Sequence, residues 1–372
     1  MNRRPSKSRL EYDEFQKSGT IKAFSPDKHF FESNRHVSPV LVFAIVLFIG
    51  IFLCIVLNLL INCFPAMHEV SVPITGLPTE FDGMRILHIS DLKGQRFGTD
   101  QSTLRQLLQR HPFDVAVLTG DMVSEHGNAS PLYELLDVLH ELCPDAPVYL
   151  IPGDRDPEPA SMDYASSGSP FAPWVLGIRQ RHAEWLNAPV VLERDKKRLV
   201  LMTLTQGTLD IATLSRRYES LYLDALSDGD ENAIELAESN LKAVQELDRV
   251  RQSLGSEDIL IGLSHTPPRD TFRANASGKP DSYAYSLILC GHTLGGLFRL
   301  PFLGPVFYPS QDMPLYGLFP GSAVPRGLYL QGRTRIYANS GLASSDPMYP
   351  FWFPRLFNRP ELAILTLSAS KL

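Results

Sequence analysis

Hydrophobic positions along the chain fall into one long run and a series of short ones. The long run, from Val40 to Ile61, contains no charged residue and one strongly polar side chain, Asn58. A helix over this run would be about 33 Å long at a rise of about 1.5 Å per residue, which matches the hydrocarbon core of a bilayer. The run therefore predicts one transmembrane helix, within residues 38–64.

Basic residues are distributed unequally on the two sides of this run. Residues 1–37 contain eight Lys and Arg residues, and the next one after the run is Arg85. Because positive charge is retained on the cytoplasmic side, this asymmetry predicts a single-pass protein of the cell membrane with a cytoplasmic N-terminus and an extracytoplasmic remainder. A cleaved signal peptide fits less well, since the run is long and no small-x-small site follows it. Residues 1–37 lack apolar periodicity and are expected to be a disordered tail.

Short apolar runs alternate with helical stretches from Arg85 onward. The runs are continuously apolar, as in strands buried on both faces, which indicates a sheet covered by helices and hence an α/β fold. We assign this pattern to one domain over residues 65–372. The expected central strands lie at 85–90, 114–120, 148–153, 258–264 and 286–291. Helices are expected at 101–110, 131–142 and 228–254, hairpins at 190–204 and 326–341, and a last strand at 361–367.

Overall composition changes this picture little. Hydrophobic residues make up 44% of the chain, enough for a sizeable core, and the net charge is −6. Proteins that bind nucleic acid usually carry a basic surface, so we expect no nucleic-acid partner.

Five potential metal ligands occupy the carboxyl ends of the central strands. Open α/β sheets bind ligands at this edge. One aspartate there is usually a cap or a turn residue, but five carboxylates and imidazoles in order along a sheet indicate a shared site for Zn²⁺, Mn²⁺ or Fe²⁺. The residues are Asp91, Asp121, Asp154, His265 and His292.

The strand-end segments resemble a known family. "SDLK", "GDMV", "GDRD", "LSHTPPRD" and "GHTLGG" follow the order and spacing of the DxH, GD, GNH(D/E), H and GHxH motifs of the calcineurin-like metallophosphoesterases. "IYANSGL" and "PRLFNRPELAILTL" look like the end of its membrane-associated bacterial branch. The resemblance, over roughly residues 70–369, implies a four-layer α/β/β/α sandwich. It also implies two metal ions that are bridged by Asp121 and activate a hydroxide for attack on phosphorus.

This chain departs from the family pattern in one half of the implied site. Lys93 and Leu294 stand at two ligand positions of one ion, and Asp91 and Asp121 remain there. We therefore expect one divalent ion rather than two. Two facing carboxylates repel each other unless a cation lies between them, so our hypothesis is that Lys93 replaces the missing ion electrostatically. The alternative is that Lys93 extends into solvent. The ligands implied for the other ion are Asp121, Asp154, His265 and His292.

Arg155 stands where the family has the histidine of the GNH motif. Arginine binds phosphate oxygens well but does not release a proton at ordinary pH. Substrate binding could persist, whereas the loss of general-acid help typically costs about 10²–10⁴-fold in rate.

These features predict a membrane-anchored phosphoesterase that hydrolyses a phosphate ester, such as a lipid or envelope phosphate, with Arg155 and Lys93 stabilising phosphoryl charge. The alternative is a pseudophosphoesterase that binds metal or phosphate without turnover. Residues 297–319, rich in aromatic residues and proline, could line a substrate entrance, touch lipid or simply pack as a loop. Oligomeric state and the choice between monoester and diester stay open.

Overall fold

The computed structural model describes residues 38–124, 126–268, 285–300, 302–308, 318–320, 326–344 and 355–370. The chain divides into two compact units, Met1–Ile55 and Val56–Leu372. The expected tail over residues 1–37 lies outside the described residues. The expected strands and their ligand residues all belong to the second unit.

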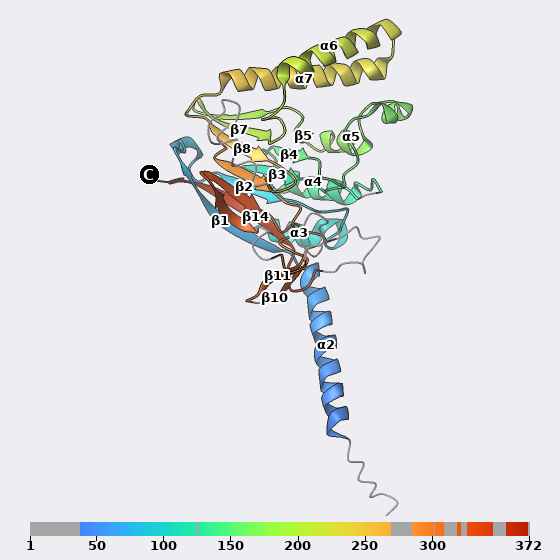
Figure 1. Cartoon of the computed structure of the whole chain (residues 1–372), viewed down its shortest axis with the longest axis vertical. Helices are drawn as coiled ribbons and strands as arrows, with labels where there is room; N and C mark the ends of the chain where they lie inside the picture. The colour runs from blue at the N-terminus through green and yellow to red at the C-terminus, as the bar shows by residue number, and fades with distance from the viewer. Residues whose placement is uncertain are drawn as a thin grey trace, which may run out of the picture. The chain divides into compact units, whose positions relative to one another are not determined.

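The long apolar run forms helix α2 (Pro39–Cys63; Figure 1). Among the described residues it is the one helix long and apolar enough to cross a membrane, with a mean hydropathy of 3.5. Asn58 lies in the last turns of α2, which belong to the second unit, and is buried. Its Nδ2 donates to the backbone oxygen of Arg355 at 2.6 Å, and its Oδ1 accepts from the N–H of Phe357 at 2.9 Å. These hydrogen bonds explain the strongly polar residue in an otherwise apolar helix.

Two mixed sheets form the centre of the second unit. The first has the strand order β1 (Ala66–Thr75), β14 (Glu361–Ser370), β2 (Arg85–Ile89), β3 (Val115–Thr119), β4 (Val148–Ile151) and β5 (Ala183–Trp185). The second has the order β12 (Gly327–Gln331), β13 (Thr334–Ala338), β9 (Leu287–Cys290), β8 (Ile259–Leu263), β7 (Lys197–Thr203) and β6 (Val190–Arg194). The five expected central strands, both hairpins and the last strand are confirmed.

Most neighbouring strands are parallel, so their carboxyl ends meet at one edge. β2, β3, β4 and β5 run parallel to one another, as do β7, β8, β9 and β13. The last strand, β14, is inserted between β1 and β2, parallel to the former and antiparallel to the latter. The ligand residues that follow β2, β3, β4, β8 and β9 are thereby brought to the same side of the molecule.

Alternate side chains of the strands build three layers of core. Leu87 of β2 packs towards helices α3 (Ser102–Leu108), α4 (Ser130–Leu142) and α5 (Pro173–Arg179), while its neighbour Ile86 faces the second sheet. On the far side, Val200 of β7 and Ile288 of β9 pack against Leu247 of helix α7 (Glu231–Ser253). Helices, sheet, sheet and helix therefore succeed one another, and the four-layer α/β/β/α sandwich is confirmed.

The helix expected over 228–254 is confirmed as α7. A second helix that was not expected, α6 (Ile211–Asp228), precedes it, and the two form a hairpin (Figure 1). Gly229 ends α6 with a left-handed φ of 70°, and the side chain of Asp230 caps α7 by accepting from the N–H groups of Asn232 and Ala233. Short 3₁₀ helices among the described residues are η2 (Thr79–Phe81), η3 (Thr99–Gln101) and η4 (Met162–Ser167).

Part of the 297–319 stretch forms a small two-stranded sheet. β10 (Phe298–Leu300) and β11 (Gly304–Phe307) pair antiparallel after the loop that follows β9. Residues 309–317 lie outside the described residues.

Candidate metal and phosphate site

The backbone is strained where the strands deliver their ligands. Asp91, Asp121 and His292 have left-handed φ values of 55°, 53° and 64°, a conformation that non-glycine residues rarely adopt. Such strain persists at functional sites where the surrounding structure imposes it. Close packing imposes it here: a Cβ on Gly120 would lie 2.6 Å from the Cα of Gly153. The glycines before the ligands therefore let neighbouring loops touch.

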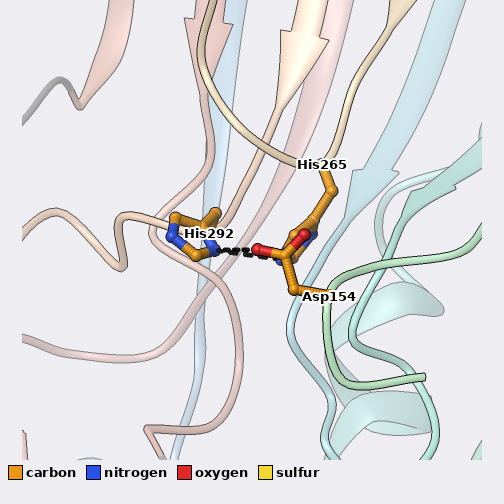
Figure 2. Close-up of side chains that lie close together, drawn as sticks. All are labelled: Asp154, His265 and His292. Atoms are coloured by element: carbon orange, nitrogen blue, oxygen red, sulfur yellow. Dashed lines mark hydrogen bonds and ion pairs between the residues drawn. The ribbon is translucent and has the colours of Figure 1, made fainter. Parts of the chain in front are cut away.

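The site has two halves. We call the half around Asp154, His265 and His292 the outer half-site and the half around Asp91 and Lys93 the inner half-site; Asp121 lies between them. Three predicted ligands face one another in the outer half-site. Figure 2 shows Asp154, His265 and His292 turned towards a common point. Nδ1 of His292 lies 3.2 Å from Oδ2 of Asp154 and 3.2 Å from Nε2 of His265. Asp121 joins this group from β3, with Oδ1 at 3.4 Å from Nε2 of His265. Carboxylates and imidazoles this close together have a donor set suited to a borderline divalent ion, so the residues fit the metal that the motifs imply.

His265 is oriented for this role by a backbone contact. Its Nδ1–H donates to the carbonyl oxygen of Thr119 at 2.8 Å, which leaves Nε2 as the atom that faces the cluster. Metal-binding histidines are typically fixed in this way. Burial alone would lower the pKa of His265, but its hydrogen bond with Asp121 and the charge of Asp91 raise that pKa to about 9. Binding of a divalent ion at Nε2 would therefore have to displace a proton.

In the inner half-site, Lys93 lies between the carboxylates of Asp91 and Asp121. Its Nζ is 3.2 Å from Oδ1 of Asp91 and 3.5 Å from Oδ2 of Asp121, and its side chain is only 7% exposed. The ammonium group therefore does not extend into solvent. Burial would raise the pKa of Asp121, but the hydrogen bond from His265 and the positive charge of Lys93 hold it below its usual range.

The remaining predicted residues frame this pair of half-sites. Oδ2 of Asp91 accepts from Oγ of Ser90 at 2.7 Å and from the N–H of His292 at 3.1 Å. Leu294 is buried in the loop after β9 and offers no ligand atom from its side chain. Arg155 is exposed next to Asp154, and its backbone N–H donates to Oδ1 of Asp121 at 2.9 Å.

Asp156 supports the site but was not singled out in the sequence. Its carboxylate accepts from the N–H of Val123 at 2.7 Å and from that of Gly153 at 2.8 Å, so it connects the loops after β3 and β4. Burial raises the pKa of Asp156 to about 6, although both hydrogen bonds oppose the shift. Its position two residues after Asp154, in "GDRD", was the available signal.

Arg355 is a second supporting residue that the sequence did not reveal. It is buried, and its guanidinium group donates to the carbonyl oxygens of Gly341, at 2.8 Å, and Ser340. A Cβ on Gly341 would lie 2.7 Å from Cβ of Asp91, so this backbone packs directly behind the inner carboxylate. Burial lowers the pKa of Arg355 to about 10, which leaves it charged.

Fold and site together define a metallophosphoesterase-type domain. Residues 84–296 match the family model of the calcineurin-like phosphoesterases, and the chain belongs to this family. It is 28% identical over 305 residues to the uncharacterized metallophosphoesterase YkuE of Bacillus subtilis (strain 168), covering 81% of this chain and 85% of that protein. It is 31% identical over 123 residues to the phosphodiesterase YaeI of Escherichia coli (strain K12), covering 31% and 40%.

Solved structures resemble the chain more weakly. The phosphopantetheinyl hydrolase PptH of Mycobacterium tuberculosis aligns over 77% of this chain and 96% of its own, with a TM-score of 0.35 and 11% identity. A likeness at this level carries no argument. The family match establishes a phosphoesterase domain from a family that uses divalent metals, as the motif resemblance predicted.

Proposed function

We propose that this protein is a membrane-anchored phosphoesterase that uses a single divalent ion, Mn²⁺, Zn²⁺ or Fe²⁺. The observation that carries the proposal is the contrast between the two half-sites. The outer half-site brings Asp154, His265 and His292 together, with Asp121 in contact with His265, whereas the inner half-site holds an ammonium group in contact with both carboxylates. The outer ligands are Asp121, Asp154, His265 and His292.

Different side chains of the site would have different roles in phosphate-ester hydrolysis. The bound ion would act as a Lewis acid on the phosphoryl group and lower the pKa of a coordinated water molecule. Lys93 forms ion pairs with Asp91 and Asp121 and would offset phosphoryl charge, while Arg155, at an exposed position, would bind phosphate oxygens. An arginine side chain replaces the histidine that could act as general acid, so an ester with a good leaving group suits this site best.

The membrane part of the proposal rests on α2 and its surroundings. Arg299 of β10 donates to the carbonyl oxygen of Leu356, and the next residue, Phe357, donates to Asn58 near the end of α2. The tip that follows β10 carries the fully exposed Phe302. An exposed aromatic tip beside the end of an apolar helix is suited to the bilayer interface. A lipid or envelope phosphate is the matching substrate class, with the domain over 65–372 extracytoplasmic and the N-terminus cytoplasmic.

A second candidate function is a metal- or phosphate-binding module without turnover. It is favoured by the same ion pairs of Lys93, because a filled inner half-site removes one of the two ions that the family mechanism uses.

One experiment separates the two functions. The full chain is purified in lipid nanodiscs, its metal content is measured, and aryl phosphate mono- and diesters are offered with added Mn²⁺. One equivalent of metal with turnover that His265→Ala abolishes supports the enzyme, whereas metal without turnover supports the binding module. His111→Ala is the matched control, because His111 pairs with Glu69 at 3.0 Å outside the ligand cluster.

A further inference from the structure

A cavity of about 480 Å³ lies beside the outer half-site, at the carboxyl ends of β4, β5, β7 and β8. His265 and the adjacent Thr266 line it on one side. The α6–α7 hairpin contributes Leu214, Val244 and Leu247 from the other side. The cavity therefore extends from a predicted metal ligand to the α6–α7 hairpin, of which the sequence predicted only α7.

The lining of this cavity is mixed: apolar and aromatic side chains make up just over half of it, and apart from His265 the rest are uncharged polar side chains such as Asn187, Gln206 and Asn240. It contains no Lys, Arg, Asp or Glu side chain, and Trp185 and Tyr218 add aromatic surface. A charged group placed there would find no Lys, Arg, Asp or Glu of opposite charge, whereas an alkyl or aryl group would contact the apolar and aromatic side chains. A volume of this size is typical of small-molecule sites, which are usually lined by apolar and aromatic residues.

We propose that this cavity binds the organic part of the substrate, an apolar alkyl or aryl group esterified to the phosphate. The inference rests on the proposed function and adds a substrate class to it. Nε2 of His265 faces Asp121 and His292, and the same residue lines the cavity. His265 is thus shared by the outer half-site, where the phosphoryl group would bind, and by the adjacent cavity.

Chain-length dependence of binding tests this assignment without relying on turnover. Calorimetry measures the affinity of the full chain in nanodiscs for methyl, butyl and hexyl phosphate. Burial of each methylene group is expected to strengthen binding about three- to fourfold. Leu214→Trp, at a half-buried position of α6, should fill the cavity and remove this gain while leaving methyl phosphate unchanged. Ala243→Leu fills it from α7 and should act in the same way.

Leu223→Trp is the matched control, since Leu223 is on the same helix, 63% exposed and outside the lining. Equal affinities for the three esters, or equal weakening of all three by Leu214→Trp, would overturn the assignment. A phosphate-free probe, 2-naphthol, separates the two proposals. Binding of 2-naphthol that Leu214→Trp abolishes, without any binding of methyl phosphate, supports the cavity and contradicts the phosphoesterase. Binding of methyl phosphate without a chain-length effect supports the phosphoesterase and contradicts the assignment of the cavity.

Discussion

Nζ of Lys93 lies 3.2 Å from Oδ1 of Asp91, a carboxylate with no exposed surface. The same ammonium group is 3.5 Å from Asp121. One positive charge therefore compensates two carboxylates that in other members of the family would, by the motif resemblance, face a metal ion. A buried charge without a partner is strongly destabilising, so Lys93 has a structural role whether or not the protein is an enzyme.

Removing this charge should cost stability. Lys93→Met keeps much of the side-chain volume but leaves Asp91 and Asp121 facing each other without a cation. We expect the free energy of unfolding in EDTA at neutral pH to fall by about 3 kcal/mol. Urea unfolding followed by fluorescence measures it. In the control Lys197→Met, an exposed pair with Glu257 is lost, and the cost should stay below about 1 kcal/mol. Equal losses in the two variants would contradict the role of Lys93.

Restoring the missing ligands should restore a second ion. Lys93→His combined with Leu294→His supplies the two imidazoles that the family motifs place at these positions. Elemental analysis of the purified protein should rise from one to two equivalents of metal. Leu294→His alone should stay at one equivalent, because Lys93 still occupies the inner half-site. If the double variant binds no additional ion, residues other than Lys93 and Leu294 also prevent a second ion from binding.

The predicted part of the site comes from local patterns. Continuous apolar runs predict buried strands, and a carboxylate or imidazole directly after each run is brought to a common edge because the strands are parallel. Asp91, Asp121 and His292 could be assigned in this way, and the structure brings them together. The sequence also raised the possibility that Lys93 replaces an ion, although it could not place the ammonium group.

The parts that escaped prediction depend on long-range packing. Arg355 is far from Asp91 along the chain and acts on it through the backbone at Gly341 and through its charge. Asn58 looked like one polar residue within an apolar helix, and its partners lie 297 and 299 positions away. The hydrophobic periodicity of a sequence contains no signal for such long-range contacts. The cavity beside His265 likewise depends on how the α6–α7 hairpin packs next to the ends of the strands, a long-range relationship.

Membrane contact of the tip after β10 can be measured directly. Phe302→Trp places a fluorophore at the fully exposed position that the proposal assigns to the bilayer interface. In vesicles that contain brominated phospholipid, its emission should be quenched more than that of the parent chain, which has three tryptophans of its own. Leu223→Trp on α6 should show no additional quenching. Equal quenching of the two added tryptophans would contradict the proposed orientation.

His88 should make the fold sensitive to acid. It is fully buried in β2, where Nε2 lies 2.8 Å from Oγ1 of Thr119, and burial lowers its pKa to about 3. Below pH 6.5 the unfolded chain binds a proton at this histidine that the folded chain does not bind until about pH 3, so stability is lost as the pH falls. Between pH 6.5 and pH 5 this site should account for about 1.5 kcal/mol of the loss.

Urea unfolding at these two pH values checks the contribution of His88. His88→Gln has no titrating ring and can still bond Thr119, so its stability should fall by about 1.5 kcal/mol less than that of the parent chain over this interval. Leu223→Gln, an exposed substitution that changes no titrating group, should keep the parent dependence. If His88→Gln responds to pH as the parent does, His88 is protonated in the fold, and burial is not what determines its charge.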